Sequence, residues 1–112
     1  MDYIAKFEMT GRLRQGPSTP IQITITRPLL EDGSTATYET WLDCGAIEKE
    51  KPRKIRGGDS LQSLALAFYV LRCNLEVARD RGWVFCDPKT GEELDLLLNL
   101  FPPTGRNSNE TD

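Results

Sequence analysis

The sequence predicts an α+β fold, in which a mainly antiparallel sheet of four or five strands carries one long helix packed on one face. A capped helical pattern runs from Asp59 to Gly82, and short β-type segments separated by turn residues flank it. At 112 residues the chain fits one domain. We assign residues 1–101 to this domain and residues 102–112 to a disordered polar tail, because the tail lacks apolar side chains to offset its ordering entropy.

The first strands are predicted before residue 45. An imperfect apolar alternation over residues 3–9 indicates an N-terminal strand, and residues 12–20 read as a loop. Ile21, Ile23 and Ile25 then alternate with polar residues, which is typical of a strand with one buried face. Residues 31–34 supply turn chemistry, so residues 36–44 form the antiparallel partner of a hairpin.

The next segment, residues 48–56, is strongly basic and contains one proline. Charges and a proline are common protections of a sheet edge, so we expect an exposed edge strand or loop. The same segment is a candidate anion or nucleic-acid patch, because clustered basic side chains bind phosphates. The residues of this patch are Lys49, Lys51, Arg53, Lys54 and Arg56. Interleaved acidic residues and a net charge of −3 make nucleic acid the less favoured partner.

The helix has clear start and stop signals. Asp59 and Gln62 form a capping box, Arg79 and Arg81 favour the negative end of the helix dipole, and Gly82 permits a left-handed stop. Apolar residues at three- and four-residue steps predict a row that faces the core. This core row contains Leu61, Leu64, Phe68, Leu71, Leu75 and Ala78.

A further apolar set lies on the opposite side of the helix, with polar residues such as Ser63 and Asn74 between the two sets. We call it the second row; it consists of Leu66, Val70, Cys73 and Val77, flanked by Tyr69. A helix on a sheet needs only one apolar face, so a second row must be covered or stay exposed. The cover could be residues 94–101, a second copy of the chain or another protein.

Beyond the helix, residues 83–85 form a short β-type segment closed by a turn at residues 87–91. A return strand could start at Glu92. The leucine-rich run from Leu94 to Phe101 fits either a strand or a short helix, because neither period is clean.

Composition excludes several kinds of chemistry. The chain contains no histidine, which removes Ser-His and Cys-His pairs and most transition-metal sites. Its three cysteines are widely spaced without a C-x-x-C pair and read as free thiols, which fits a cytoplasmic protein. No signal-peptide or membrane-span pattern is present in this sequence. We therefore expect no cofactor, no metal, no membrane partner and no catalysis.

These segments together resemble a group of small bacterial proteins known only as a domain of unknown function. The resemblance rests on the isoleucine-rich hairpin, the helix entry GGDSLQSLALA and the Trp83 segment, and it spans roughly residues 21–101. It implies a bacterial origin and a sheet-plus-helix fold. No activity or site residue is implied by it.

The leading functional hypothesis from the sequence is a small cytoplasmic protein-binding module of an immunity-like or accessory kind. The second row is its candidate interface, and the partner is another protein or a second copy of the chain. A nucleic-acid-associated protein that uses residues 49–56 is one alternative. An enzyme is the other, and it would require an apolar pocket that holds a carboxylate or thiol with a strongly shifted pKa.

Overall fold

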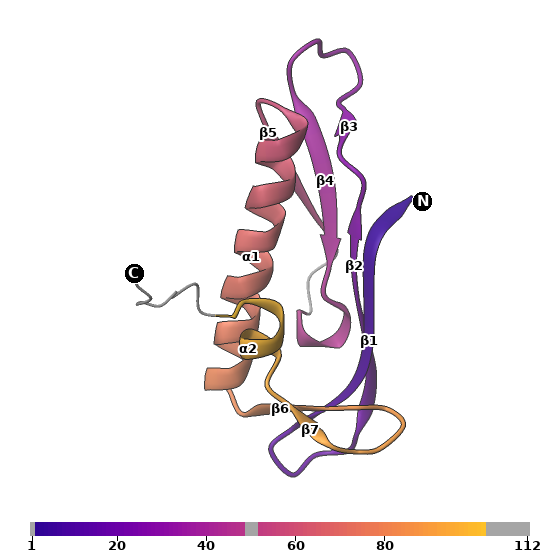
Figure 1. Ribbon diagram of the computed structural model, residues 1–112, viewed down its shortest axis with the longest axis vertical. Helices are drawn as coiled ribbons and strands as arrows, with labels where there is room; N and C mark the ends of the chain where they lie inside the picture. Colours follow the sequence, from indigo (N-terminus) through magenta and orange to yellow (C-terminus); the bar gives the residue numbers. More distant parts are fainter. Residues whose placement is uncertain (1, 49–51, 103–112) are drawn as a thin grey trace, which may run out of the picture.

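The computed structural model describes residues 2–48 and 52–102, and within them it confirms the α+β fold: an antiparallel sheet carries one long helix on one face (Figure 1). The strands are β1 Tyr3–Leu13, β2 Thr19–Thr26, β3 Leu29–Leu30, β4 Tyr38–Asp43, β5 Arg53–Gly57, β6 Trp83–Cys86 and β7 Glu93–Leu94. The helices are α1 Ser60–Asp80, α2 Leu96–Leu100 and the 3₁₀ turn η1 Gly45–Ile47. The predicted tail, apart from Pro102, lies outside the described residues, as do Lys49 and Lys51.

The sheet has seven strands within the described residues, in the order β3-β4-β2-β1-β6-β7, and β5 pairs with the other side of β4. Every pairing is antiparallel. Two strands, β3 and β7, have only two residues each, which explains why the sequence suggested four or five. β5 is an edge strand, as expected.

The first strand is longer than expected, because β1 continues through residues 12 and 13, which the sequence indicated as loop. Pairing explains the continuation, because residues 10–13 lie opposite residues 83–86 of β6. A Cβ at Gly11 would clash with the Ile21 side chain, so glycine leaves room for that side chain over the strand. A register shift between Tyr3 and Ala5 accounts for the imperfect alternation at Ile4.

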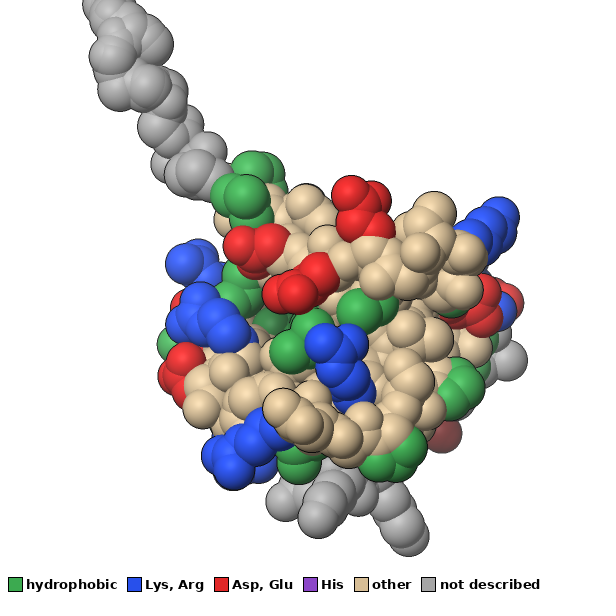
Figure 2. Space-filling view, turned by 90° about the horizontal axis from the view of Figure 1, so that it is seen from below, with side chains coloured by type: hydrophobic (Ala, Val, Ile, Leu, Met, Phe, Trp, Pro, Cys, Tyr) green, Lys and Arg blue, Asp and Glu red, His purple; other side chains and the backbone are tan. Residues whose placement is uncertain are grey.

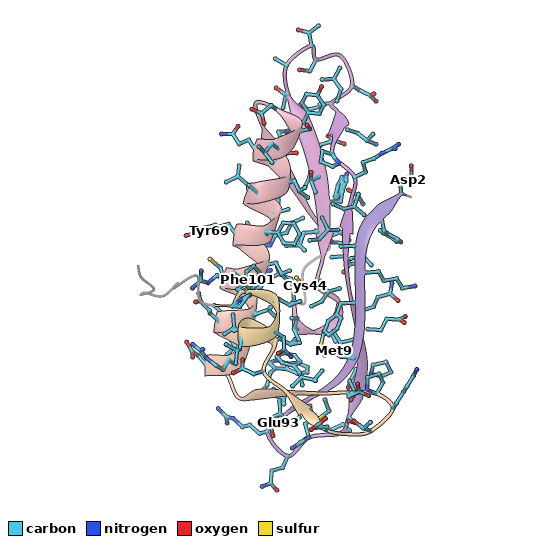
Figure 3. The ribbon with its side chains drawn as sticks, viewed as in Figure 1. Asp2, Met9, Cys44, Tyr69, Glu93 and Phe101 are labelled. Carbon is cyan, nitrogen blue, oxygen red and sulfur yellow. The ribbon has the colours of Figure 1, made fainter. Side chains whose placement is uncertain are left out.

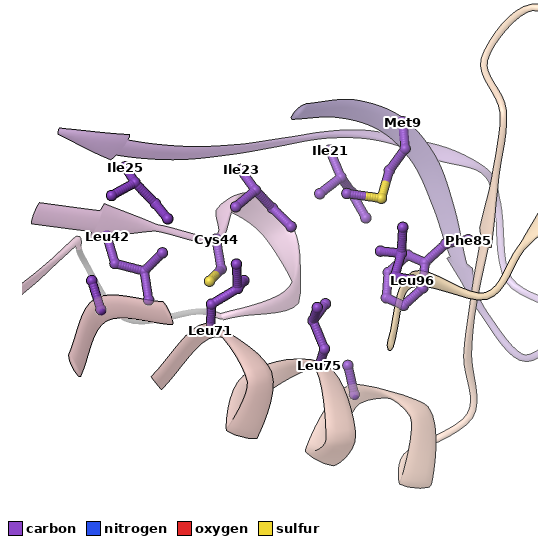
Figure 4. Packing of buried hydrophobic residues seen from close by; sticks show 12 residues of the cluster. Met9, Ile21, Ile23, Ile25, Leu42, Cys44, Leu71, Leu75, Phe85 and Leu96 are labelled. Carbon is purple, nitrogen blue, oxygen red and sulfur yellow. The ribbon is translucent and has the colours of Figure 1, made fainter. Parts of the chain in front are cut away.

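The core lies between the sheet and the helices. Ile21, Ile23 and Ile25 face α1 as their alternation predicted, and each is at most 4% exposed. In Figure 4, Leu71 and Leu75 of α1 point toward these isoleucines. Met9, Phe85 and Leu96 fill the other end of the core, beneath α2.

For the leucine-rich C-terminal run the sequence left a strand and a short helix open, and the structure contains both. Residues 93–94 pair with β6 as the short strand β7. Asp95 then accepts a hydrogen bond from the backbone N–H of Leu98, at 3.1 Å, and starts the helix α2. Leu96, at 2% exposed, anchors this helix in the core. Among the described residues no helix combines the length and apolarity needed to cross a membrane.

Candidate protein-binding surface

The position of α1 is fixed at its first turn. The Oδ1 atom of Asp59 accepts a hydrogen bond from the backbone N–H of Gln62 at 2.7 Å, and the Gln62 side chain accepts one from the N–H of Gly58. The predicted capping box is therefore confirmed, except that the Gln62 side chain bonds to the N–H of Gly58 and not to that of the cap residue Asp59. A Cβ on Gly57 would lie 2.5 Å from the backbone nitrogen of Ser63, so glycine is needed for β5 to pass this close to the helix.

Small and polar residues form the centre of the contact between α1 and the sheet. Ser63 and Ala67 are fully buried, and the hydroxyl groups of Ser63 and Thr40 of β4 hydrogen bond at 2.9 Å. Further along, the Asn74 amide donates to the Sγ atom of Cys44 and to a carboxylate oxygen of Glu48, at 3.5 and 2.9 Å. The polar flank that the sequence placed between the two apolar rows thus faces the sheet.

The predicted core row is consequently wrong at two positions. Leu61 is 75% exposed and Phe68 is 38% exposed, whereas Leu71, Leu75 and Ala78 are buried as expected. The physical reason is angular position: at about 100° per residue, Leu61 and Phe68 lie outside the arc of α1 that Ser63, Ala67, Leu71 and Ala78 bury against the sheet. Further apolar residues lie along the two flanks of this buried arc.

The second row occupies one of these flanks, beside β5, and not the back of the helix. Val70 packs against the core, and Cys73 is half-buried. Leu66, Tyr69 and Val77 are 39%, 65% and 47% exposed. Figure 3 shows Tyr69 pointing away from the sheet, while Cys44 and Met9 lie on its helix side. Leu66 and Val77 of the second row, and the flanking Tyr69, are therefore accessible.

Residues 94–101, the intramolecular cover suggested by the sequence, pack on the other flank of α1. A hollow of about 390 Å³ there is bounded by Leu75 and Arg79 of α1, by β6 and by residues 93–97. A smaller one lies between Arg72, Glu76 and Arg79 of α1 and Leu97, Leu98 and Phe101. The C-terminal segment thus covers the opposite flank around residues 72–79 and leaves Leu61 and Phe68 exposed.

An open groove of about 670 Å³ begins at Val77, where the second row ends. Its walls come from the end of β1 with the turn that follows, the η1 region, β5, the end of α1 and the start of β6. The lining residues are Leu13, Arg14, Ala46, Ile47, Glu48, Arg53, Asn74, Val77, Arg81 and Trp83. Figure 2, which looks at the molecule from below Figure 1, shows basic, acidic and apolar side chains interspersed on that face.

Three arginines border this groove. Arg53 is held by Glu48, with nitrogen–oxygen distances of 2.7 and 3.2 Å. Arg14 has a left-handed backbone, with φ of 57°, and its side chain lies against the bare α-carbon of Gly82. Within the described residues neither Arg14 nor Arg81 forms a salt bridge. No sequence pattern reveals this grouping, because only the tertiary structure brings residues 14, 53 and 81 together.

The described part of the basic patch does not form one continuous positive surface. Successive residues of β5 point to opposite faces of the sheet, so Arg53 lies on the helix side while Lys54 and Arg56 lie on the other. Lys54 pairs with Glu39 at 3.7 Å and lies 5.8 Å from the centre of the Trp41 ring. Arg56 pairs with Glu31 at 2.8 Å, which raises the pKa of the guanidinium above its ordinary value.

The thiol closest to the polar centre of the contact belongs to Cys44. Burial, partly offset by the hydrogen bond from Asn74, raises the pKa of this thiol from 9.0 to about 11. It stays protonated at neutral pH, and only the thiolate is a strong nucleophile. All three cysteines are free, as predicted, and Cys44 and Cys86 are buried.

Both tryptophans are half-buried. Trp83 stacks on Phe85 with ring centroids 6.2 Å apart and forms one wall of the groove. Trp41 lies on the sheet face away from α1, beneath Lys54. Trp83 is therefore the tryptophan that adjoins the candidate surface.

Three comparisons with known proteins gave no match: none with a family model, none with a curated protein and none with a solved structure. Within residues 2–48 and 52–102, no three Cys, Asp or Glu side chains are grouped closely enough to hold a metal ion. The bacterial resemblance of the sequence thus stays a prediction.

Proposed function

We propose that the chain is a small cytoplasmic protein-binding module without catalytic activity, which recognises its partner through the second row and the adjoining groove. The observation that carries the proposal is the exposure of Leu66, Tyr69 and Val77 on the side of α1 that α2 does not reach. Apolar side chains in a continuous row on a helix are typical of sites that receive another helix or an extended segment.

The groove adds a charge preference to this apolar row. Arg14 and Arg81 lie where the row ends at Val77, and neither has a salt bridge within the described residues. A partner segment with apolar side chains along its length and a carboxylate near one end would satisfy both parts of the surface. Arginine suits this role because its planar group binds carboxylates through two hydrogen bonds.

The test is affinity capture of the tagged protein from its own cells at low and high salt, with Leu66→Glu and Val77→Glu as surface variants. Leu98→Glu is the matched control, because Leu98 is 54% exposed on α2 at the other flank of α1. We expect one stoichiometric protein with the wild type and the control, retained at high salt because apolar contacts are not screened. Both surface variants should lose it while their circular dichroism stays unchanged.

Two outcomes would contradict the proposal. Capture that is the same in all four proteins would place the contact elsewhere. Recovery of nucleic acid that is lost at high salt would favour the basic patch instead, since phosphate contacts weaken steeply with salt.

A further inference from the structure

Within the described residues, the first half of β1 has a partner strand on one side only. Residues 3–11 of β1 pair with β2, but on the other side of β1 the strand β6 reaches only residues 10–13. Figure 1 shows the upper part of β1 with no described strand on that side. Residues 5–9 therefore form an open edge in the described structure, and open edges are templates for strand pairing.

The direction of each backbone group on this edge follows from the pairings. The N–H of Arg14 donates to the carbonyl of Gly82 at 2.9 Å, which directs the groups of Arg14 toward the β6 side. Because these directions alternate along a strand, the groups of Lys6 and Glu8 point to the same side and meet no strand. Those of Ala5, Phe7 and Met9 point to β2.

This edge is complementary to itself. If two copies of β1 lie antiparallel with a two-fold axis at Phe7, Lys6 of each copy stands opposite Glu8 of the other. The N–H and C=O groups of Lys6 and Glu8 point toward the other copy, so each Lys6–Glu8 pair forms two backbone hydrogen bonds between the strands. The opposite charges attract on the exposed face of the sheet, and the two Phe7 rings meet on the helix side at the axis, where cross-strand aromatic pairs are favourable.

From this geometry we infer that a second copy of the chain binds the open edge of β1, so that two sheets join into one across a two-fold axis. The axis passes Phe7, and residues 5–9 of both copies form the new pairing. Neighbouring registers lack this match: a shift that places Lys6 opposite Lys6 brings like charges together. The inference uses a surface separate from the second row and does not depend on the proposed function.

The test exchanges the two charges and measures mass in solution by sedimentation equilibrium. Wild-type protein should form dimers in a concentration-dependent manner. Lys6→Glu and Glu8→Lys each place like charges opposite one another twice per dimer, so each should weaken dimerisation at least tenfold. The double variant K6E/E8K restores opposite charges and should recover the dimer. Both side chains are largely exposed, 49% and 63%, so the fold should tolerate all three variants.

Hydrogen exchange gives a second readout at the backbone. The amides of Lys6 and Glu8 should exchange rapidly in dilute protein and become protected as dimers form, while the amide of Phe7 stays protected throughout. Wild-type protein that remains monomeric at about 1 mM, where even millimolar affinity gives substantial dimer, would overturn the inference. A dimer unaffected by the single changes, or a double variant that does not recover it, would do the same.

Discussion

The two flanks of α1 carry similar apolar side chains in different surroundings. On the flank that faces α2, Leu75 is 1% exposed and contributes to the core together with Leu96. On the flank beside β5, Leu66 and Val77 are 39% and 47% exposed. A fully buried leucine contributes about 1.5–3 kcal/mol to stability, and a half-exposed one contributes much less.

The two flanks of α1 therefore differ in role: one stabilises the fold, and the other has apolar side chains available for binding. The covered flank and the polar centre hold α1 on the sheet, so residues there cannot change without loss of stability. On the open flank Val70 still packs against the core, but Leu66, Tyr69 and Val77 expose apolar surface to water. Substitutions on the two flanks should therefore have very different effects on the free energy of unfolding.

The largest effect is expected at the covered flank. Leu75→Ala should lower the free energy of unfolding by about 3 kcal/mol, because it leaves a cavity in a closely packed core. Urea denaturation followed by circular dichroism measures this change. Leu61→Ala in the same helix is the control; Leu61 is 75% exposed, so its loss should change stability by less than about 0.5 kcal/mol. Equal effects at the two positions would show that α1 is rotated relative to this description.

A somewhat smaller effect is expected at the polar centre. Ser63→Ala should cost about 2 kcal/mol, because it leaves the buried hydroxyl of Thr40 without its partner. Thr40→Val should cost less, since the Ser63 hydroxyl still donates to the carbonyl of Ser60 at 3.2 Å. The double variant should be more stable than the sum of the two losses predicts. Strictly additive losses in urea denaturation would mean that the two hydroxyl groups do not interact.

Local signals made much of this fold predictable. The ends of α1 depend on Asp59, Gln62 and Gly82, which act on their own neighbours in the chain. The buried face of β2 follows from the alternation of its isoleucines. By contrast, the sequence could not show which side of α1 faces the sheet, because the buried position of Ser63 depends on Thr40, a residue in another element.

The candidate site was only partly predictable for the same reason. The second row was visible as a helical pattern, but its place beside β5 depends on how closely α1 approaches the sheet. Arg14 and Arg81 join Arg53 at the groove only after the β1–β2 turn has packed against Gly82. Conversely, the basic patch looked continuous in sequence, and strand alternation separates its described members onto two faces of the sheet.

The smallest effect on stability is expected at the open flank. Tyr69→Ala and Val77→Ala should each change the free energy of unfolding by no more than about 0.5 kcal/mol, because both side chains are already half in water and alanine is a better helix former. The measurement is again urea denaturation, with Leu75→Ala as the reference for a core residue.

A loss above about 1 kcal/mol at either position would break the comparison between the flanks, since half-exposed side chains without other contacts rarely cost as much. It would mean that Tyr69 or Val77 is covered by something in solution, and a second copy of the chain would be the first candidate to examine. Such a cover should make the loss depend on protein concentration, because assembly adds stability by mass action. A small loss at every concentration leaves the flank free in the isolated protein, which is the state that a partner-binding surface requires.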